Sequence, residues 1–247
     1  TSDESFKGVK ITAENITIEN GSHISANGKG YLNGPGEPSS EFAGASYGGI
    51  GDRNIQGSPY GSAKEPIDLG SGGSGNFRGG GAISLSVNNV ITNNGTISAN
   101  GDQNSSGGSI YIRAKTLAGS GNLSANGGGF FLGSNIYGSG SGGRIAVYYE
   151  NSSFDGVTEA KGGCGSYDSF TPYCGQNGTV GLFNESTNDF YVNNSSWKFM
   201  ENDGPFSFNN IIFNTAKITS ENDVIITADN IIIDNESSFI LADNQEL

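Results

Sequence analysis

The sequence has little positive charge, little histidine and no long apolar run. Its 247 residues include 12 Lys and Arg against 25 Asp and Glu, for a net charge of -13. This balance argues against nucleic acid and anionic lipid as partners, because their phosphates would be repelled. No run of about 18 apolar residues is present, so neither a transmembrane helix nor direct membrane insertion is predicted. One histidine and two cysteines are too few for a His/Cys zinc site.

The sequence also lacks the 3.6-residue apolar spacing that is typical of amphipathic helices. Only 34% of the residues are hydrophobic, which is low for an ordinary core, and 41 are glycine. The absence of a Gly-X-Y period excludes collagen, and recurrent Ile and Val pairs argue against a disordered linker. Asn-Gly, which readily forms tight turns, recurs along the chain. These features predict an all-β protein of short strands.

Two short motifs recur along the chain. The first is an apolar residue followed by Ser-Ala-Asn-Gly, and the second is a glycine pair followed by alternating apolar residues. Copies of the first begin at Ile24, Ile97 and Leu123, with a degenerate copy at Val157; the apolar residues of the second begin at Ile83, Ile110, Ile145 and Val180. The distance from the second motif to the next first motif is nearly constant, whereas the return distance varies widely. All of the length variation therefore falls on one side of the cycle.

This cycle predicts a parallel β-helix, or β-solenoid, with three short strands per coil. Each motif supplies one strand, and a third apolar patch, at Ile16 and Ile18 or around Leu117, lies between them. A stack of coils forms one continuous narrow core, so a low apolar fraction suffices. An antiparallel β-sandwich is the alternative, but it gives no reason for one fixed distance and one variable distance.

Long insertions follow the Ser-Ala-Asn-Gly strand, so we expect them on one Gly-rich, loop-rich flank. They comprise residues 28–81, 127–143 and 162–178. Aromatic residues gather there and are candidates for stacking on sugar rings, although each can instead fold back over the helix. The candidate ligand-binding residues are Tyr47, Tyr60, Phe130, Phe131, Tyr137, Tyr167 and Tyr173.

A second, longer repeat joins the two ends of the sequence. At an offset of 215, residues recur in unbroken register: Val9, Ile11, Thr12, Ala13, Asn15, Ile16, Ile18, Asn20 and Ser22 reappear as Val224, Ile226, Thr227, Ala228, Asn230, Ile231, Ile233, Asn235 and Ser237. We expect residues 1–214 to form one repeat unit and residues 215–247 to begin the next unit of a tandem array. Alternatively, the first and last coils of a single domain merely resemble each other.

The motifs resemble the glycine-rich repeat regions of very large cell-surface proteins of bacteria and protists. The matching segments, in order, include "ITIENGSHISANGKGY", "GGGAISL", "GTISANG", "SGGSIYI", "GSGGRIAVYY" and "NGTVGL", and only 183–214 match weakly. This resemblance implies a parallel β-helix in an extracellular or cell-surface protein. It brings no catalytic residues.

The residues that carry chemistry are sparse. The spacing of Cys164 and Cys174 favours a disulfide across one loop, the alternative being two reduced thiols. His23 lies at an outward strand position, with no serine and aspartate to complete a triad. Glu201 and Asp203 are weak calcium candidates, since no D-x-D-x-D-G loop is present. The candidates for a polysaccharide lyase are Asp52, Arg53, Glu65, Asp68, Arg78, Arg113 and Arg144, of which Arg113 and Arg144 come nearest to a constellation.

These observations predict a non-catalytic structural unit of an extracellular stalk, filament or surface layer. Its partners would be neighbouring copies of the same unit along the fibre axis, and no cofactor is required. The alternative is a carbohydrate-binding adhesion module that uses the aromatic residues of the flank to bind glycans. A third possibility is a polysaccharide lyase or hydrolase, but no pair of carboxylates recurs at matching strand positions.

Overall fold

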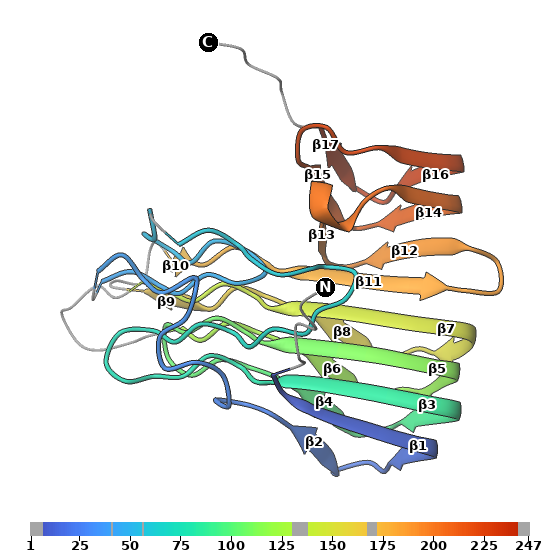
Figure 1. The fold of residues 1–247 in the computed structure, drawn as a ribbon, viewed down its shortest axis with the longest axis horizontal. Helices are drawn as coiled ribbons and strands as arrows, with labels where there is room; N and C mark the ends of the chain where they lie inside the picture. Colours follow the sequence, from blue (N-terminus) through green and yellow to red (C-terminus); the bar gives the residue numbers. More distant parts are fainter. Residues whose placement is uncertain (1–6, 41, 56, 130–137, 167–171, 242–247) are drawn as a thin grey trace, which may run out of the picture.

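The computed structural model describes residues 7–40, 42–55, 57–129, 138–166 and 172–241, and is mostly β (Figure 1). An eight-stranded sheet runs through the molecule in the order β1-β3-β5-β7-β11-β12-β14-β16. Its strands are β1 (Val9–Ile18), β3 (Ala82–Asn93), β5 (Ser109–Gly119), β7 (Arg144–Phe154), β11 (Thr179–Asn184), β12 (Asp189–Asn193), β14 (Phe206–Asn214) and β16 (Ile226–Asp234). All neighbours pair in parallel except β11 and β12, which are antiparallel.

Shorter strands form three smaller sheets. One parallel sheet contains β2 (His23–Ser25), β4 (Thr96–Ser98), β6 (Asn122–Ser124) and β8 (Val157–Glu159), and another contains β13 (Ser196–Phe199), β15 (Lys217–Ser220) and β17 (Ser238–Ile240). A hairpin joins β9 (Cys164–Ser166) to β10 (Pro172–Cys174). Within the described ranges the only helix is the single 3-10 turn η1 (Glu201–Asp203), and no helix is long and apolar enough to cross a bilayer.

Copies of the two motifs stack in register, as predicted. In the long sheet, Ile83 pairs with Ile110 and Ile110 with Ile145, while Ile97 pairs with Leu123 in the short sheet. The degenerate copy differs, because Leu123 pairs with Thr158 rather than with Val157. Thr158-Glu159-Ala160-Lys161-Gly162 is therefore the true counterpart of the motif, and the sequence alignment at Val157 was wrong by one residue.

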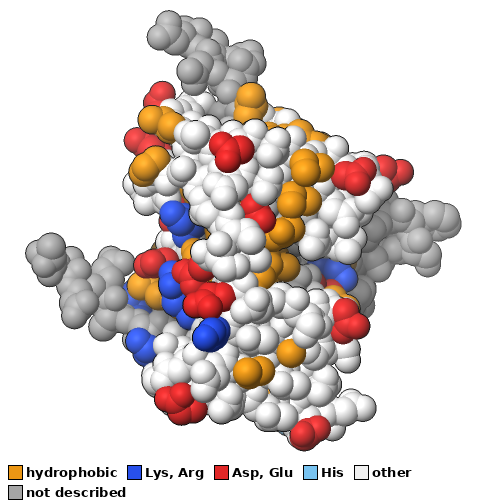
Figure 2. Space-filling view, turned by 90° about the vertical axis from the view of Figure 1, so that its right-hand side faces the viewer, with side chains coloured by type: hydrophobic (Ala, Val, Ile, Leu, Met, Phe, Trp, Pro, Cys, Tyr) orange, Lys and Arg blue, Asp and Glu red, His pale blue; other side chains and the backbone are white. Residues whose placement is uncertain are grey.

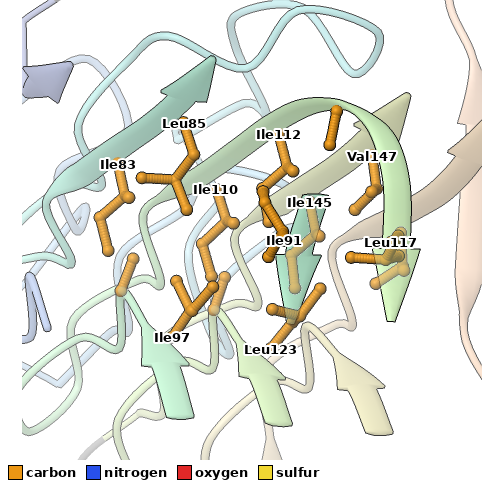
Figure 3. Packing of buried hydrophobic residues seen from close by; sticks show 14 of the residues in the cluster. Ile83, Leu85, Ile91, Ile97, Ile110, Ile112, Leu117, Leu123, Ile145 and Val147 are labelled. Atoms are coloured by element: carbon orange, nitrogen blue, oxygen red, sulfur yellow. The ribbon is translucent and has the colours of Figure 1, made fainter. Parts of the chain in front are cut away.

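We call one strand of the long sheet, together with the short strand that follows it in sequence, a layer. Each layer contains two strands where the sequence predicted three. The glycine-pair motif and the third apolar patch form one long strand, as in β3, whose pairing with β5 shifts register between Val87 and Val90. This irregularity bends the strand without ending it. Figure 3 shows the result in a long strand that curves over the buried cluster, so that Ile112 and Leu117, both in β5, face the same interior. The prediction of three separate strands is therefore corrected.

The long sheet has a hydrophobic core on each face. The first core is built around β3, β5 and β7, and the second around β12 to β15. Alternate residues of β7 separate the two: Ile145 and Val147 belong to the first core, whereas Ala146 and Tyr148 belong to the second. Because successive side chains of a strand point to opposite faces, the two cores lie on opposite sides of the sheet. The switch occurs where β11 reverses into β12.

The described part of the Gly-rich flank is largely irregular backbone, yet much of it is packed into the interior. Its segments lie together on the left of Figure 1 and exchange backbone hydrogen bonds. Ala45, for example, donates its N–H to the carbonyl of Asn104 at 2.9 Å and accepts one from Ser141 at 2.9 Å. Ala43, Ser46 and Tyr47 are fully buried. Glycine, serine and alanine are small enough for adjacent backbones to approach to hydrogen-bonding distance, which corrects the expectation of exposed loops.

Candidate functional site

The predicted disulfide between Cys164 and Cys174 is confirmed. The two sulfur atoms are 2.06 Å apart and join β9 to β10 within the flank. Neither cysteine is left free for redox or metal chemistry within the described residues. The bridge therefore ties together the outer end of one insertion.

Of the aromatic candidates that the structure describes, Tyr47 is buried and Tyr60 and Tyr173 are partly buried by contacts within the flank. Tyr47 is fully buried, and its hydroxyl lies 2.6 Å from that of Ser109, so the expectation that Tyr47 is exposed is wrong. The Tyr60 hydroxyl donates to the carbonyl of Leu69 at 2.6 Å. Tyr173 lies under the guanidinium of Arg53, 4.4 Å from the ring centroid. The other candidates, Phe130, Phe131, Tyr137 and Tyr167, lie outside the described residues.

Arg144 is a buried cation at the centre of the molecule. Its guanidinium donates to the carbonyl of Tyr60 at 3.1 Å and to the hydroxyl of Thr179 at 3.3 Å, and it lies 5.4 Å from the centroid of the Tyr47 ring. Burial lowers the pKa of Arg144. Arg113, in contrast, is exposed and bonds Glu185 at 2.7 Å. The two arginines therefore make different contacts and do not form the pair that a lyase would need.

Raising the pH above 10 is expected to destabilise the fold through Tyr47. Burial raises the pKa of its phenol from 10.0 to about 12, against smaller opposing effects from Arg144 and Ser109. The folded state holds this proton more tightly than the unfolded state, so its stabilisation is complete below pH 10 and is lost as the pH rises through 12. This shift corresponds to about 3 kcal/mol. Thermal unfolding followed by circular dichroism between about pH 9 and 12 measures it.

The Tyr47→Phe variant provides the control for this pH dependence. Phenylalanine keeps the buried ring but cannot ionise, so the loss of stability with rising pH should be shallower than in the unchanged chain. Part of the dependence should remain, because burial also raises the pKa of Tyr149 to about 12. An unchanged slope in the variant would exclude Tyr47 as the titrating group.

The calcium candidates Glu201 and Asp203 have structural contacts at the junction of the two cores. The Asp203 carboxylate accepts hydrogen bonds from the Ser62 hydroxyl and, at 2.8 Å, from the Ala63 N–H. The Glu201 N–H donates to the Glu221 carboxylate at 3.1 Å. Over the described ranges, no group of three or more His, Cys, Asp or Glu side chains is placed to hold a metal ion. Asp203 thus anchors the long insertion to the second core.

The most distinctive structural feature is the pair of open edges of the long sheet. β1 and β16 are the outermost strands, so each has one side without a strand partner in the described structure. Unpaired strand edges are templates for pairing with a further strand. Figure 2 shows a row of hydrophobic side chains over the upper part of the molecule, towards the end at which β16 lies. The exposed residues of this end include Ile225, Ile231, Ile232, Ile233, Ile240 and Leu241.

The two edge strands occupy equivalent positions of the longer repeat. Ile11 and its counterpart Ile226 both pack against a core, the first core for Ile11 and the second for Ile226. The short strands that follow, β2 and β17, are also separated by the same offset of 215, and their central residues Ile24 and Phe239 face the same two cores. The sequence repeat is therefore also a repeat of local structure.

Asparagine side chains connect successive layers at both ends. The Asn230 amide donates to the Asn210 side-chain oxygen at 2.9 Å. In the short sheet, the Asn27 side-chain oxygen accepts the N–H of Asn100 at 2.8 Å, and Asn100 in turn accepts the N–H of Asn126 at 2.7 Å. The asparagine of Ser-Ala-Asn-Gly thus bonds the next layer, which explains its recurrence.

Sequence reasoning detected the repeated edge strands but missed a pocket beside β13 and the buried position of Arg144. An isolated arginine after a glycine pair carries no sign of its burial, and the pocket is formed by segments far apart in the sequence. Comparisons with protein families, with curated proteins and with solved structures found no match to this chain.

Proposed function

We propose that this chain is a non-catalytic structural unit that stacks with further copies of the same repeat in an extracellular rod or layer. The observation that carries the proposal is that the two open edges are complementary halves of one layer. β1 has the following layer beside it but no preceding one, whereas β16 has the preceding layer but no following one. A complete layer of an extended stack would have both neighbours.

The exposure of equivalent residues supports this interpretation. Ile18, covered by the β3 layer, is 5% exposed, whereas its counterpart Ile233 at the open edge is 49% exposed. The reverse holds at the start of the repeat, where Val9 is 63% exposed and Val224 is half-buried. A further layer on each edge would therefore cover the residues that are exposed there. This burial is the hydrophobic driving force for stacking.

We also propose that each stack is a short parallel β-helix. The chain leaves each Ser-Ala-Asn-Gly strand and returns beside it. At the point of return, the Gly108 N–H donates to the Ala99 carbonyl at 2.7 Å, and the Gly143 N–H donates to the Ala125 carbonyl at 2.7 Å. This recurring bond closes one layer and begins the next. The disulfide favours an oxidising compartment, which supports placing the protein outside the cytosol or on a cell surface.

A chain that contains two repeat units tests the stacking proposal. It consists of residues 1–238 followed directly by residues 24–247, so that the internal copy of β16 also serves as β1 of the second unit. We expect amide protons of this internal strand to exchange roughly tenfold more slowly, or slower still, than those of β16 in the single chain. Hydrogen exchange followed by mass spectrometry measures the difference.

Replacing Ile231 and Ile233 with lysine in the internal strand serves as a matched control. Both positions are about half exposed in the single chain, so the same replacements should have little effect there. In the two-unit chain they would place charges under the following layer and remove the protection. Equal exchange of β16 in the single and two-unit chains would show that the units do not stack.

A further inference from the structure

The strand β3 carries one residue more than its neighbours at a single point. Opposite Glu14 of β1, it places two residues, Asn88 and Asn89, and the pairing on either side is regular. Its pairing with β5 shifts at the same place. Two residues opposite one define a β-bulge. The other parallel pairs of the long sheet have no register shift within the described ranges, so the bulge distinguishes β3 from the remaining strands.

Side chains of β1 are matched to this bulge. The Glu14 carboxylate accepts hydrogen bonds from both extra residues, from Asn88 Nδ2 at 2.6 Å and from Asn89 Nδ2 at 3.3 Å. The next residue, Asn15, accepts the Val90 N–H with its side-chain oxygen at 3.3 Å. A carboxylate followed by an asparagine therefore satisfies the two amides of the bulge and the backbone donor that comes after it.

The open edge of β16 carries the same pair of side-chain types. Asp229 and Asn230 stand at the offset of 215 from Glu14 and Asn15, and both are exposed. The Asn230 amide bonds Asn210 in the preceding layer, while its side-chain oxygen has no partner among the described residues. For Asn15 the converse holds, since its oxygen bonds the following layer and its amide is free within the described structure. The two asparagines thus show two halves of one set of bonds.

The turns that follow the two edge strands show the same division. In both, the serine N–H donates back to the acidic residue three positions earlier, at 2.9 Å for Ser22 and 3.1 Å for Ser237. The Ser22 carbonyl accepts the Thr96 N–H of the following layer at 3.0 Å. The Ser237 hydroxyl accepts the Ala216 N–H of the preceding layer at 3.0 Å. One end of the chain therefore shows the contacts of this layer on one side, and the other end shows those on the opposite side.

We propose that Asp229 and Asn230 form a recognition site for the β3–β4 layer of the following copy of the repeat. The Asp229 carboxylate binds the amides of Asn88 and Asn89 in that copy. The Asn230 oxygen accepts its Val90 N–H. This inference rests on the stacking function proposed above, and it adds which layer stacks on β16 and in which register.

Other registers do not provide these contacts. A slip by one residue would turn Ile226 away from the second core. A slip by two residues keeps every side chain on its face, but it would place the bulge opposite Thr227 or Ile231, neither of which has a carboxylate. The bulge therefore specifies one register among those that the hydrophobic pattern allows.

Cysteine cross-linking in the two-unit chain tests the register. Thr227 of the internal strand and Ser86 of the second unit are replaced by cysteine, because their equivalents Thr12 and Ser86 are direct partners in β1 and β3. The control chain carries cysteine at Thr227 and at Ser84 of the second unit, which meet only after a slip by two residues. We expect the first pair to form a disulfide at least about tenfold faster on mild oxidation, as judged by mass spectrometry of proteolytic peptides.

The Asn230→Ala variant tests the contact itself. In the internal strand it removes the acceptor of the Val90 N–H of the second unit, so this amide should exchange about fivefold faster than in the unchanged two-unit chain. Thr227→Ala is the matched control, since the exposed Thr227 side chain forms no hydrogen bond with any described residue, and it should leave the exchange of Val90 unchanged.

The outcomes separate this proposal from the stacking function. If the internal strand is protected from exchange but the slipped cysteines join, or neither pair joins, the units stack and the proposed register is wrong. Unchanged exchange of Val90 in Asn230→Ala would likewise overturn the contact. If the internal strand is not protected, the stacking function fails, and the recognition site fails with it.

Discussion

Replacing Gly143 with valine is expected to lower the free energy of unfolding by about 4 kcal/mol or more, among the largest effects of a single substitution. A Cβ atom at Gly143 would collide with the carbonyl oxygen of Gly108 and the carbonyl carbon of Gly107 in the preceding layer. These are backbone atoms of the ladder, so neither layer can move aside without breaking hydrogen bonds. Chemical denaturation of the variant, followed by circular dichroism, measures the loss.

Gly21→Ala is the appropriate comparison for this substitution. Gly21 has a positive φ of 82°, but a Cβ atom there would meet no other atom within 4 Å. The expected cost is about 1–2 kcal/mol, since only the backbone conformation is unfavourable for alanine. If Gly143→Val were no more destabilising than Gly21→Ala, the close approach of the layers would not explain why glycine is needed at position 143.

The Phe190→Ala variant is expected to lose about 3–5 kcal/mol, because it removes a large buried side chain from the second core. The Phe190 ring contacts those of Phe183, Phe208 and Trp197, at centroid distances of 4.7, 5.2 and 4.9 Å. The cavity would thus adjoin the only tryptophan. Unfolding followed by indole emission reports on this core directly.

The Ile55→Ala variant controls for the removal of an apolar side chain as such. Ile55 is 94% exposed, so its truncation should change the free energy of unfolding by less than about 0.5 kcal/mol. A loss below about 1 kcal/mol for Phe190→Ala would be incompatible with a closely packed second core.

The repeat made much of the first stack predictable from sequence. A fixed interval between the two motifs, combined with period-2 alternation, sufficed to align Ile83 with Ile110 and Ile24 with Ile97. The offset between the ends likewise identified β1 and β16 as equivalents. These are local patterns that follow from which residues must face a core.

The reversal at β11 and β12 was not predictable from the same patterns. Alternation specifies which side chains share a face, but it does not specify whether the next strand runs parallel or antiparallel. The turn at residues 185–188 ends in Asn188, with a positive φ of 52°, yet similar Asn-rich turns occur within the parallel layers. The change of core from one face to the other was therefore missed.

Burial in the flank was also missed, for a different reason. Glycine-rich sequence predicts turns when each segment is considered alone, whereas here several such segments bond to one another. Tyr47 is interior only because residues 138–143 and 104–110 surround its segment, and those contacts join distant parts of the chain. The pocket beside β13 depends on contacts of the same long-range kind.

The reversal between β11 and β12 also determines the symmetry of a longer assembly. β1 and β16 are equivalent in the repeat, but they run in opposite directions and face cores on opposite sides of one continuous sheet. From β1 to β16, the strand direction and the side that faces the core are both reversed, whereas the direction of stacking is kept. Apart from the twist of the sheet, this change is a rotation of about half a turn about the stacking direction. Successive units would thus be related by a two-fold screw axis, with their glycine-rich sides projecting alternately left and right, and the true axial period would span two units.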